Sequence, residues 1–415
     1  MTSITRLAAR MLLGSSRLVK RLAQTYTHSH LSLVAVNSGS MSDHSRLAKT
    51  IFRQERMHKL HAVIVGAGAL GNQVFQTLGL LGTGRITVVD PDVVDPTNLT
   101  RSVPFRCHGL IGRNKAEALA EVSRALFPFS EVIAIPQEIA DVGFCDLAPA
   151  GIIFCCVDSD LARLEVAYIS TKLDLPVVDA ALGTQNYSHG RVTFFPGRSA
   201  ACFGCRLTSE KRRELLTLWD AEVHSCSADA FAVPEREFPS TPTMASVVGA
   251  MQVELGLRSL IAHQPGGPRK SVSIEITIDE PMHLEKIQVP LSHACPFHDW
   301  NGTLTGSPGP ATETTVSRLL EAAEKANAPR SALVLDWPLC TEARCLDCGH
   351  SWHPMMRIAL IRKKGVCPLC NSHRVADQQS VRSLEYGGPW ASFTLAQLGL
   401  PEHHLHSVRL LSGVT

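Results

Sequence analysis

The sequence contains no uninterrupted run of 18 or more apolar residues, the length expected of a helix that crosses a membrane. It also lacks an excess of one charge, because 40 Lys and Arg against 38 Asp and Glu give a net charge of +2. Such a balance argues against a protein that mainly coats nucleic acid or anionic membrane. We therefore expect no membrane span, and nucleic acid is not an expected partner.

The length and composition of the chain are those of an ordinary globular protein. Its 415 residues are 45% hydrophobic and 19% charged, which predicts two or three domains with a real core. The 13 cysteines do not suggest a secreted disulfide scaffold, which would be unusual at this length. Seven of them have spacings typical of metal sites in a reducing compartment, so we expect a cytoplasmic protein.

Residues 1–42 form an N-terminal extension without a single Asp or Glu. Its basic residues are Arg6, Arg10, Arg17, Lys20 and Arg21. This composition resembles an amphipathic transit peptide, and the alternative is an upstream extension before a start at Met41. Both readings leave the segment out of the fold.

Residues 43–300 alternate between strand and helix patterns. Strands are expected at 61–65, 85–90, 132–136, 151–157, 177–179, 190–196 and 272–278, and helices at about 71–81, 113–126 and 243–261. The β-α-β alternation predicts an α/β, Rossmann-like domain whose sheet is mainly parallel, with helices on both faces.

The C-terminal part of the chain carries a second small unit. Residues 301–331 are expected to form a linker and a short helix, residues 332–380 a zinc ribbon, and residues 381–415 a tail. The ribbon is predicted from Cys345, Cys348, Cys367 and Cys370, two Cys-x-x-Cys pairs separated by 18 residues. Such a unit is too small to fold on its core alone, so the metal should supply its stability. Cys340, His350 and His353 are nearby alternative ligands.

Basic residues occupy the gap of the predicted ribbon. They are Arg357, Arg362, Lys363 and Lys364. We expect them to form a solvated surface, with an acidic partner or nucleic acid as the alternative.

A glycine-rich turn predicts nucleotide binding. Gly66, Gly68 and Gly71 follow a strand and open a helix, where small residues and free N–H groups let a phosphate approach. Asp90 ends the next strand, at the position where a carboxylate accepts hydrogen bonds from a ribose. This pattern does not choose between NAD and ATP.

Polar and cationic residues beyond the turn favour ATP. Asn98 and Arg101 follow the second strand, and Lys115 opens the next helix. A triphosphate attacked by an anion needs its charge neutralised, whereas a dinucleotide site needs no such group. The alternative is a solvated charged loop.

Four stretches together resemble the ThiF/MoeB and ubiquitin-activating-enzyme superfamily, over about residues 46–298. They are Val-Gly-Ala-Gly-Ala-Leu-Gly at 65–71, Val-Val-Asp-Pro-Asp-Val-Val-Asp-Pro-Thr-Asn-Leu-Thr-Arg at 88–101, Gly-Arg-Asn-Lys at 112–115 and Cys-Val-Asp-Ser at 156–159. The resemblance implies that Asp90 holds the ribose, that Asn98, Arg101 and Lys115 hold phosphates, and that Asp158 holds Mg²⁺. It also implies a homodimer and an arginine before the first strand, often from the second subunit. Arg46 is the candidate, and Arg53 competes with it.

A second zinc site is expected inside the nucleotide-binding domain. Its ligands would be Cys202, Cys205, Cys295 and His298. Each pair has the two-residue spacing that lets two side chains bind one tetrahedral Zn²⁺, but 89 residues separate the pairs. The resembled family places two such half-sites in these regions, usually all cysteine. The alternative is a set of buried free thiols.

Cys226 is the candidate nucleophile. Many members of the resembled family carry a reactive cysteine in the loop before the helix expected at 243–261, although Cys226 lies farther from that helix than usual. Cys155 and Cys156 lie in a predicted strand, and Cys107 and Cys145 have no distinctive pattern. We read these four as ordinary core or loop thiols.

The resemblance implies that the chain adenylates the C-terminal carboxylate of a ubiquitin-like or sulfur-carrier protein with ATP. Thioester formation on Cys226 and transfer to a conjugating enzyme would follow, and sulfur transfer for cofactor synthesis is the alternative. Two other classes stay open. An NAD-dependent oxidoreductase would need a hydride-transfer motif, which we do not find, and a zinc adaptor would bind nucleotide without catalysis.

Overall fold

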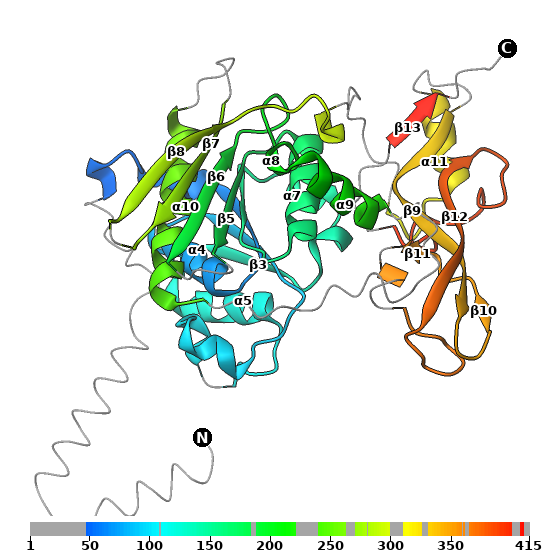
Figure 1. Cartoon of the computed structure of the whole chain (residues 1–415), viewed down its shortest axis with the longest axis horizontal. Helices are drawn as coiled ribbons and strands as arrows, with labels where there is room; N and C mark the ends of the chain where they lie inside the picture. Colours follow the sequence, from blue (N-terminus) through cyan, green and yellow to red (C-terminus); the bar gives the residue numbers. More distant parts are fainter. Residues whose placement is uncertain are drawn as a thin grey trace, which may run out of the picture. The chain divides into compact units, whose positions relative to one another are not determined.

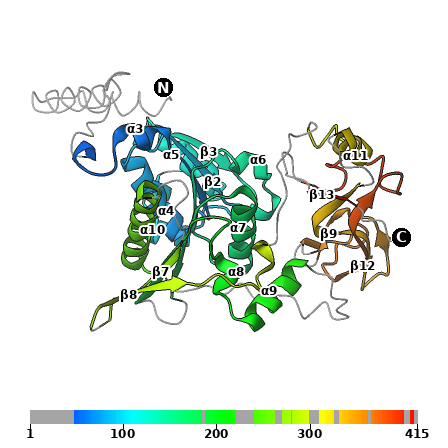
Figure 2. The same cartoon turned by 90° about the horizontal axis from the view of Figure 1, so that it is seen from above.

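A computed structural model of the chain is shown in Figures 1 and 2. It describes residues 47–107, 109–183, 188–220, 240–262, 270–279, 281–298, 310–325, 331–358, 360–361, 365–400 and 407–410. All of these belong to the compact unit Leu47–Thr415. The predicted N-terminal extension and Arg46 lie outside the described residues.

An eight-stranded sheet forms the centre of the larger part. Its order is β3-β2-β1-β4-β5-β6-β7-β8. The strands are β1 His61–Val65, β2 Arg85–Val89, β3 Glu131–Ile135, β4 Ile152–Cys155, β5 Val177–Leu182, β6 His189–Phe195, β7 Ser271–Thr277 and β8 His283–Val289. The strands from β3 to β5 pair in parallel, and β6, β7 and β8 continue the sheet in antiparallel fashion. The Rossmann-like, mainly parallel fold is confirmed.

Helices cover both faces of this sheet. They are α3 Gln54–Lys59, α4 Ala69–Leu80, α5 Lys115–Leu126, α6 Phe144–Leu147, α7 Asp160–Leu173, α8 Phe203–Arg206, α9 Ser209–Asp220 and α10 Pro242–Ala262. Short 3₁₀ helices occur at Leu47–Lys49, Pro96–Thr100, Pro104–Arg106, Ile139–Asp141 and Pro296–His298. Figure 2 shows α4 and α10 on one side of the sheet and α7 on the other.

The two-sided cover explains the apolar strands. Every residue of β1 is buried, and its side chains alternate between two core clusters. Ile64 packs in the cluster that includes residues of α4, α5 and α10, whereas Val63 and Val65 pack in the cluster that includes α7. A strand buried on both faces reads as a continuous apolar run, which is why β1 was predictable from the sequence.

Helix α10 is the one helix, among the described residues, that is long and apolar enough to cross a membrane by length and composition alone. Its buried face includes Met244, Val248 and Leu257, which pack in the sheet core. The buried Gln252 donates hydrogen bonds to the Cys155 and Val178 carbonyl oxygens of β4 and β5. These contacts are those of a helix that covers the sheet.

The C-terminal residues form a five-stranded antiparallel sheet around one long strand. Strand β9, Ser331–Cys345, pairs with β10 Ser351–Trp352, β11 Met356–Arg357, β12 Val375–Glu385 and β13 Ser407–Leu410. Helix α11, Val316–Lys325, packs Leu319 and Leu320 into a core shared with Leu333 of β9 and Leu398. The predicted domain limits at 301, 332 and 381 stay a prediction.

Arg357 is buried, contrary to the expected solvated surface, with 4% of its surface exposed. Its guanidinium forms an ion pair with Glu165, donates to the Ala140 carbonyl oxygen at 3.0 Å and lies 4.0 Å from the centre of the Trp337 ring. A carboxylate partner makes this burial tolerable. Arg362, Lys363 and Lys364 lie outside the described residues.

Candidate functional site

The glycine turn lies between β1 and α4 and is built from close backbone contacts. Gly66 has a φ of 92°, a conformation that residues with a side chain rarely adopt. A Cβ atom on Gly71 would lie 1.9 Å from the Gly66 carbonyl oxygen, so helix and turn pack too closely for any other residue. No side chain caps the N-terminus of α4, whose N-cap residue is Gly68. The turn therefore presents backbone N–H groups of the kind that hold a phosphate.

Three strands bring the predicted nucleotide ligands to one edge. Strand β1 lies between β2 and β4, with Val65 opposite Val89 on one side and Cys155 on the other. Because all three strands are parallel, the Gly66 turn, Asp90 and the segment leading to Asp158 share their carboxyl edge. This is the edge at which open α/β sheets bind ligands.

Asp90 is 4% exposed, and both of its carboxylate oxygens accept backbone hydrogen bonds. The Ala67 N–H donates at 2.5 Å and the Asp92 N–H at 2.8 Å. Burial raises the pKa of the Asp90 carboxyl, while Lys115 and the two N–H donors act against that shift. The structure thus fixes the carboxylate directly beside the glycine turn, where a ribose would meet it.

Lys115 begins α5 beside this carboxylate. Its ammonium lies 2.9 Å from Asp92, whose side chain is 64% exposed, whereas only 12% of the lysine side chain is exposed. The helix starts here because the Asn114 side chain accepts from the Glu117 N–H. The lysine is therefore held at the sheet edge by a partner that a phosphate can replace.

Asn98 and Arg101 lie in and after the 3₁₀ helix Pro96–Thr100. Asn98 is buried and completes a capping box, accepting from the Asp95 N–H at 2.9 Å. Arg101 donates to the Ser240 hydroxyl at 2.7 Å. Asn98 is thus used structurally at this turn, and Arg101 reaches the segment that leads into α10.

Asp158 follows β4 and is exposed. Helix α7 begins two residues later, with Ser159 as its N-cap. An exposed carboxylate at the phosphate edge is the type of ligand that Mg²⁺ takes together with substrate phosphates, so the donor chemistry fits the expected ion. The Mg²⁺ assignment to Asp158 stays a prediction.

Cys202, Cys205, Cys295 and His298 form a cluster that could hold a zinc ion, with ligand atoms within 4.8 Å of one another. The Cys202 sulfur lies 3.9 Å from that of Cys205 and 3.6 Å from that of Cys295. A tetrahedral Zn–S₄ site has edges of about 3.8 Å, given Zn–S bonds of about 2.3 Å. The Nε2 atom of His298 faces the cluster, and its Nδ1 atom lies 3.0 Å from the Arg198 carbonyl oxygen. A hydrogen bond from the second ring nitrogen is typical of a metal-binding histidine.

The second cluster consists of Cys345, Cys348, Cys367 and Cys370, again within 4.8 Å of one another. Sulfur–sulfur distances of 3.6 Å, between Cys345 and Cys370 and between Cys348 and Cys367, fit the same tetrahedron. The alternative ligands have other contacts. Cys340 donates to the Glu342 carbonyl oxygen, His350 stacks on Trp352, and His353 bonds to the Thr341 carbonyl oxygen.

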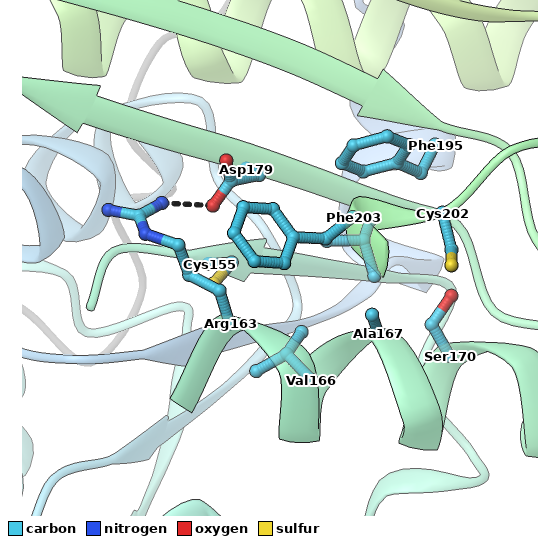
Figure 3. Close-up of a pocket in the computed structure, with 10 residues that line it drawn as sticks. Cys155, Arg163, Val166, Ala167, Ser170, Asp179, Phe195, Cys202 and Phe203 are labelled. Carbon is cyan, nitrogen blue, oxygen red and sulfur yellow. Dashed lines mark hydrogen bonds and ion pairs between the residues drawn. The ribbon is translucent and has the colours of Figure 1, made fainter. Parts of the chain in front are cut away.

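A small pocket lies between α7 and the sheet (Figure 3). Its volume of about 10 Å³ is barely that of one water molecule, so it cannot hold a nucleotide. In Figure 3 Arg163 of α7 and Asp179 of β5 point toward each other and form an ion pair. This pair was not predicted from the sequence. A charged residue within an apolar strand, as in Val-Val-Asp-Ala-Ala-Leu at 177–182, was the available signal.

Two predicted catalytic residues, Arg46 and Cys226, lie outside the described residues. Cys155 and Cys156 are buried, as expected of core thiols. Burial raises the pKa of Cys155, and it raises the pKa of Cys156 to about 12. Neither thiol is suited to act as a nucleophile at neutral pH.

Comparison with known proteins gives a family match over residues 43–294, to a model described as "ThiF family". The chain is 28% identical over 153 residues to "Adenylyltransferase and sulfurtransferase UBA4" of Meyerozyma guilliermondii, covering 37% of this chain and 35% of that protein. It is 30% identical over 162 residues to "Nedd8-activating enzyme E1 catalytic subunit" of Drosophila melanogaster, covering 36% and 35%. The matches thus span about a third of each relative.

Among solved structures, the chain is similar to Escherichia coli MccB with MccA-N7isoASN. The identity is 18%, the TM-score is 0.47, and the match covers 62% of this chain and 75% of that one. The same protein with ATP gives 19% identity and a TM-score of 0.43, over 60% and 68%.

Proposed function

The chain belongs to the ThiF family, and on that premise we propose that it uses ATP to adenylate the C-terminal carboxylate of a ubiquitin-like or sulfur-carrier protein. One observation carries the proposal. The glycine turn, Asp90 and Lys115 lie together at the carboxyl edge of the sheet, and the segment with Asp158 ends at the same edge. This set suits a nucleoside triphosphate better than a dinucleotide, because it adds a cation and a carboxylate to the turn.

The reaction needs charge neutralisation more than proton transfer. A carboxylate oxygen of the carrier attacks the α-phosphorus of ATP, the bond from that phosphorus to the bridging oxygen breaks, and pyrophosphate leaves. The nucleophile is already ionised, so no side chain acts as a base. The glycine turn and Asp90 position the nucleotide, while Lys115, Arg101 and the amide NH₂ group of Asn98, whose oxygen serves the capping box, hold the phosphates. A magnesium ion bound at Asp158 would neutralise phosphate charge.

We further propose a thioester intermediate and two kinds of protein partner. The Cys226 thiolate attacks the acyl carbon of the adenylate, AMP leaves and a thioester forms, a step that suits ubiquitin-like conjugation with a conjugating enzyme as acceptor. The alternative is sulfur transfer for cofactor synthesis. A homodimer would supply Arg46 from the second subunit. We place the enzyme in the cytoplasm. The Arg101–Ser240 hydrogen bond joins the phosphate edge to the segment that leads into α10.

The proposed function is tested by the exchange of labelled pyrophosphate into ATP with a panel of purified ubiquitin-like and sulfur-carrier proteins. We expect exchange with a carrier whose C-terminal carboxylate is free, and none with the same carrier after that carboxylate is converted to an amide. If the chain binds ATP and no carrier supports exchange, a non-catalytic zinc adaptor becomes the better description.

Cys226 should form a thioester with the carrier. A thiolate captures an acyl-adenylate faster than water does, so a band of added mass should appear on a non-reducing gel with ATP, Mg²⁺ and carrier. The band should vanish with added thiol and be missing in Cys226→Ser. Cys107→Ser is the matched control, because Cys107 is an exposed thiol of the same domain. Normal pyrophosphate exchange in the wild type without any band would favour sulfur transfer.

A further inference from the structure

Arg163 is a buried cation at the start of α7, with 5% of its surface exposed. Its guanidinium makes three contacts. It donates to the Val157 carbonyl oxygen at 2.5 Å and to the Ala180 carbonyl oxygen at 2.8 Å, and it forms an ion pair with Asp179. The side chain therefore ties the turn after β4 to the neighbouring strand β5.

Asp179 keeps this cation in place. It is 1% exposed and accepts from Arg163 on one oxygen and from Arg191 of β6, at 2.9 Å, on the other. Burial alone would raise the pKa of the Asp179 carboxyl, but the two guanidinium groups lower it. Figure 3 shows the Arg163 and Asp179 side chains meeting between the helix and the strand.

The contact with Val157 reaches the nucleotide edge. That carbonyl belongs to the peptide unit that joins Val157 to Asp158, so the guanidinium fixes the backbone from which the Asp158 side chain projects. The start of α7 has a separate N-cap, because the Ser159 hydroxyl accepts from the Ala162 N–H at 3.5 Å. Burying a guanidinium is costly, so a contact of this kind calls for a role beyond the helix start.

We propose that Arg163, held by Asp179, is a positioning residue that aims the Asp158 carboxylate at the magnesium ion of bound MgATP. This inference rests on the proposed function, which assigns Mg²⁺ to Asp158. Residues that orient a metal ligand typically change metal affinity about 10–100-fold when they are replaced. Arg163→Lys keeps the charge but cannot make the three contacts of the planar fork.

The test uses isothermal titration of the full chain with AMPCPP, with and without Mg²⁺. The measured quantity is the dissociation constant without Mg²⁺ divided by the dissociation constant with Mg²⁺. A large ratio means that Mg²⁺ strongly assists binding. We expect a large ratio for the wild type and a ratio near one for Asp158→Asn. Arg163→Lys and Asp179→Asn should lower the ratio about tenfold and leave the Mg²⁺-free affinity unchanged.

Arg357→Lys is the matched control. The Arg357 guanidinium is also buried, forms an ion pair with Glu165 of the same helix and donates to the Ala140 carbonyl oxygen. This variant should keep the wild-type ratio. Melting temperature and zinc content show whether each variant is folded. If Arg163→Lys does not fold, Asp179→Asn still tests the proposal.

Two results overturn the positioning role. One is a wild-type ratio in folded Arg163→Lys and Asp179→Asn. The other is an equal loss of affinity with and without Mg²⁺, which marks a merely structural residue. A ratio that Asp158→Asn does not change overturns the magnesium assignment of the proposed function itself, and the positioning role with it.

Discussion

Lys115→Ala should reduce carrier-dependent pyrophosphate exchange about a thousandfold. The lysine ammonium pairs with Asp92, close enough to Asp90 to act on its carboxyl, and its removal leaves charge on the reacting phosphate uncompensated. Folding should change little, because the partner Asp92 is 64% exposed and stays hydrated. Exchange rates at saturating ATP, together with melting temperature, measure both effects.

Arg85→Ala is the control for this substitution. Arg85 forms a comparable ion pair with Glu131, at 2.8 Å, but it begins β2, whereas Asp90 follows the end of that strand. The variant removes a paired cation from the opposite edge of the same sheet and should keep full exchange. If Lys115→Ala also keeps full exchange, the active site is not where we place it.

Replacing both Cys345 and Cys348 by serine should remove one of two bound zinc ions and unfold the C-terminal sheet. The cluster closes that sheet where β9 ends at Cys345 and β12 begins at Val375, and the Leu346 N–H donates to the Arg374 carbonyl oxygen beside it. Structural zinc contributes about 10–16 kcal/mol in small domains, more than the residual stability of such a sheet. The zinc content measured by elemental analysis should fall from two ions per chain to one.

ATP binding should survive this change, because the nucleotide edge belongs to another sheet with its own core. Cys340→Ser is the control, since Cys340 lies in the same strand but outside the cluster. It should retain both ions. If the double serine variant still binds two zinc ions, these cysteines are not ligands. If the wild-type chain binds only one zinc ion, one of the two predicted zinc sites is wrong.

Patterns within a few residues predicted most of the fold. The Gly66–Gly71 turn and the strands β1, β2 and β4 were readable because both faces of these strands are buried. Strand β8 was not predicted. All but the last of its seven residues are exposed, so its sequence shows neither an apolar run nor an alternation. Its pairing with β7 defines it, and only the folded chain shows that pairing.

The charged residues likewise separate into what the local sequence predicts and what only the folded chain shows. Arg357 occurs among basic residues in the ribbon gap, and local sequence predicted a hydrated surface there. Its partner Glu165 lies 192 residues away, so no window of sequence contains the pair. Arg163 and Asp179 are only 16 residues apart, yet their contact exists because α7 packs on β5.

By itself, the sequence determined the nucleotide-binding turn and the two Cys-x-x-Cys pairs of the ribbon, because both depend on spacings of a few residues. The tertiary structure decided which distant groups meet. It brings Cys202 to Cys295 and Cys205 to His298 across 93 residues, and it places a carboxylate against the buried Arg163. The physical reason is that ligand geometry and the cost of a buried charge depend on distances through space, which sequence separation does not fix.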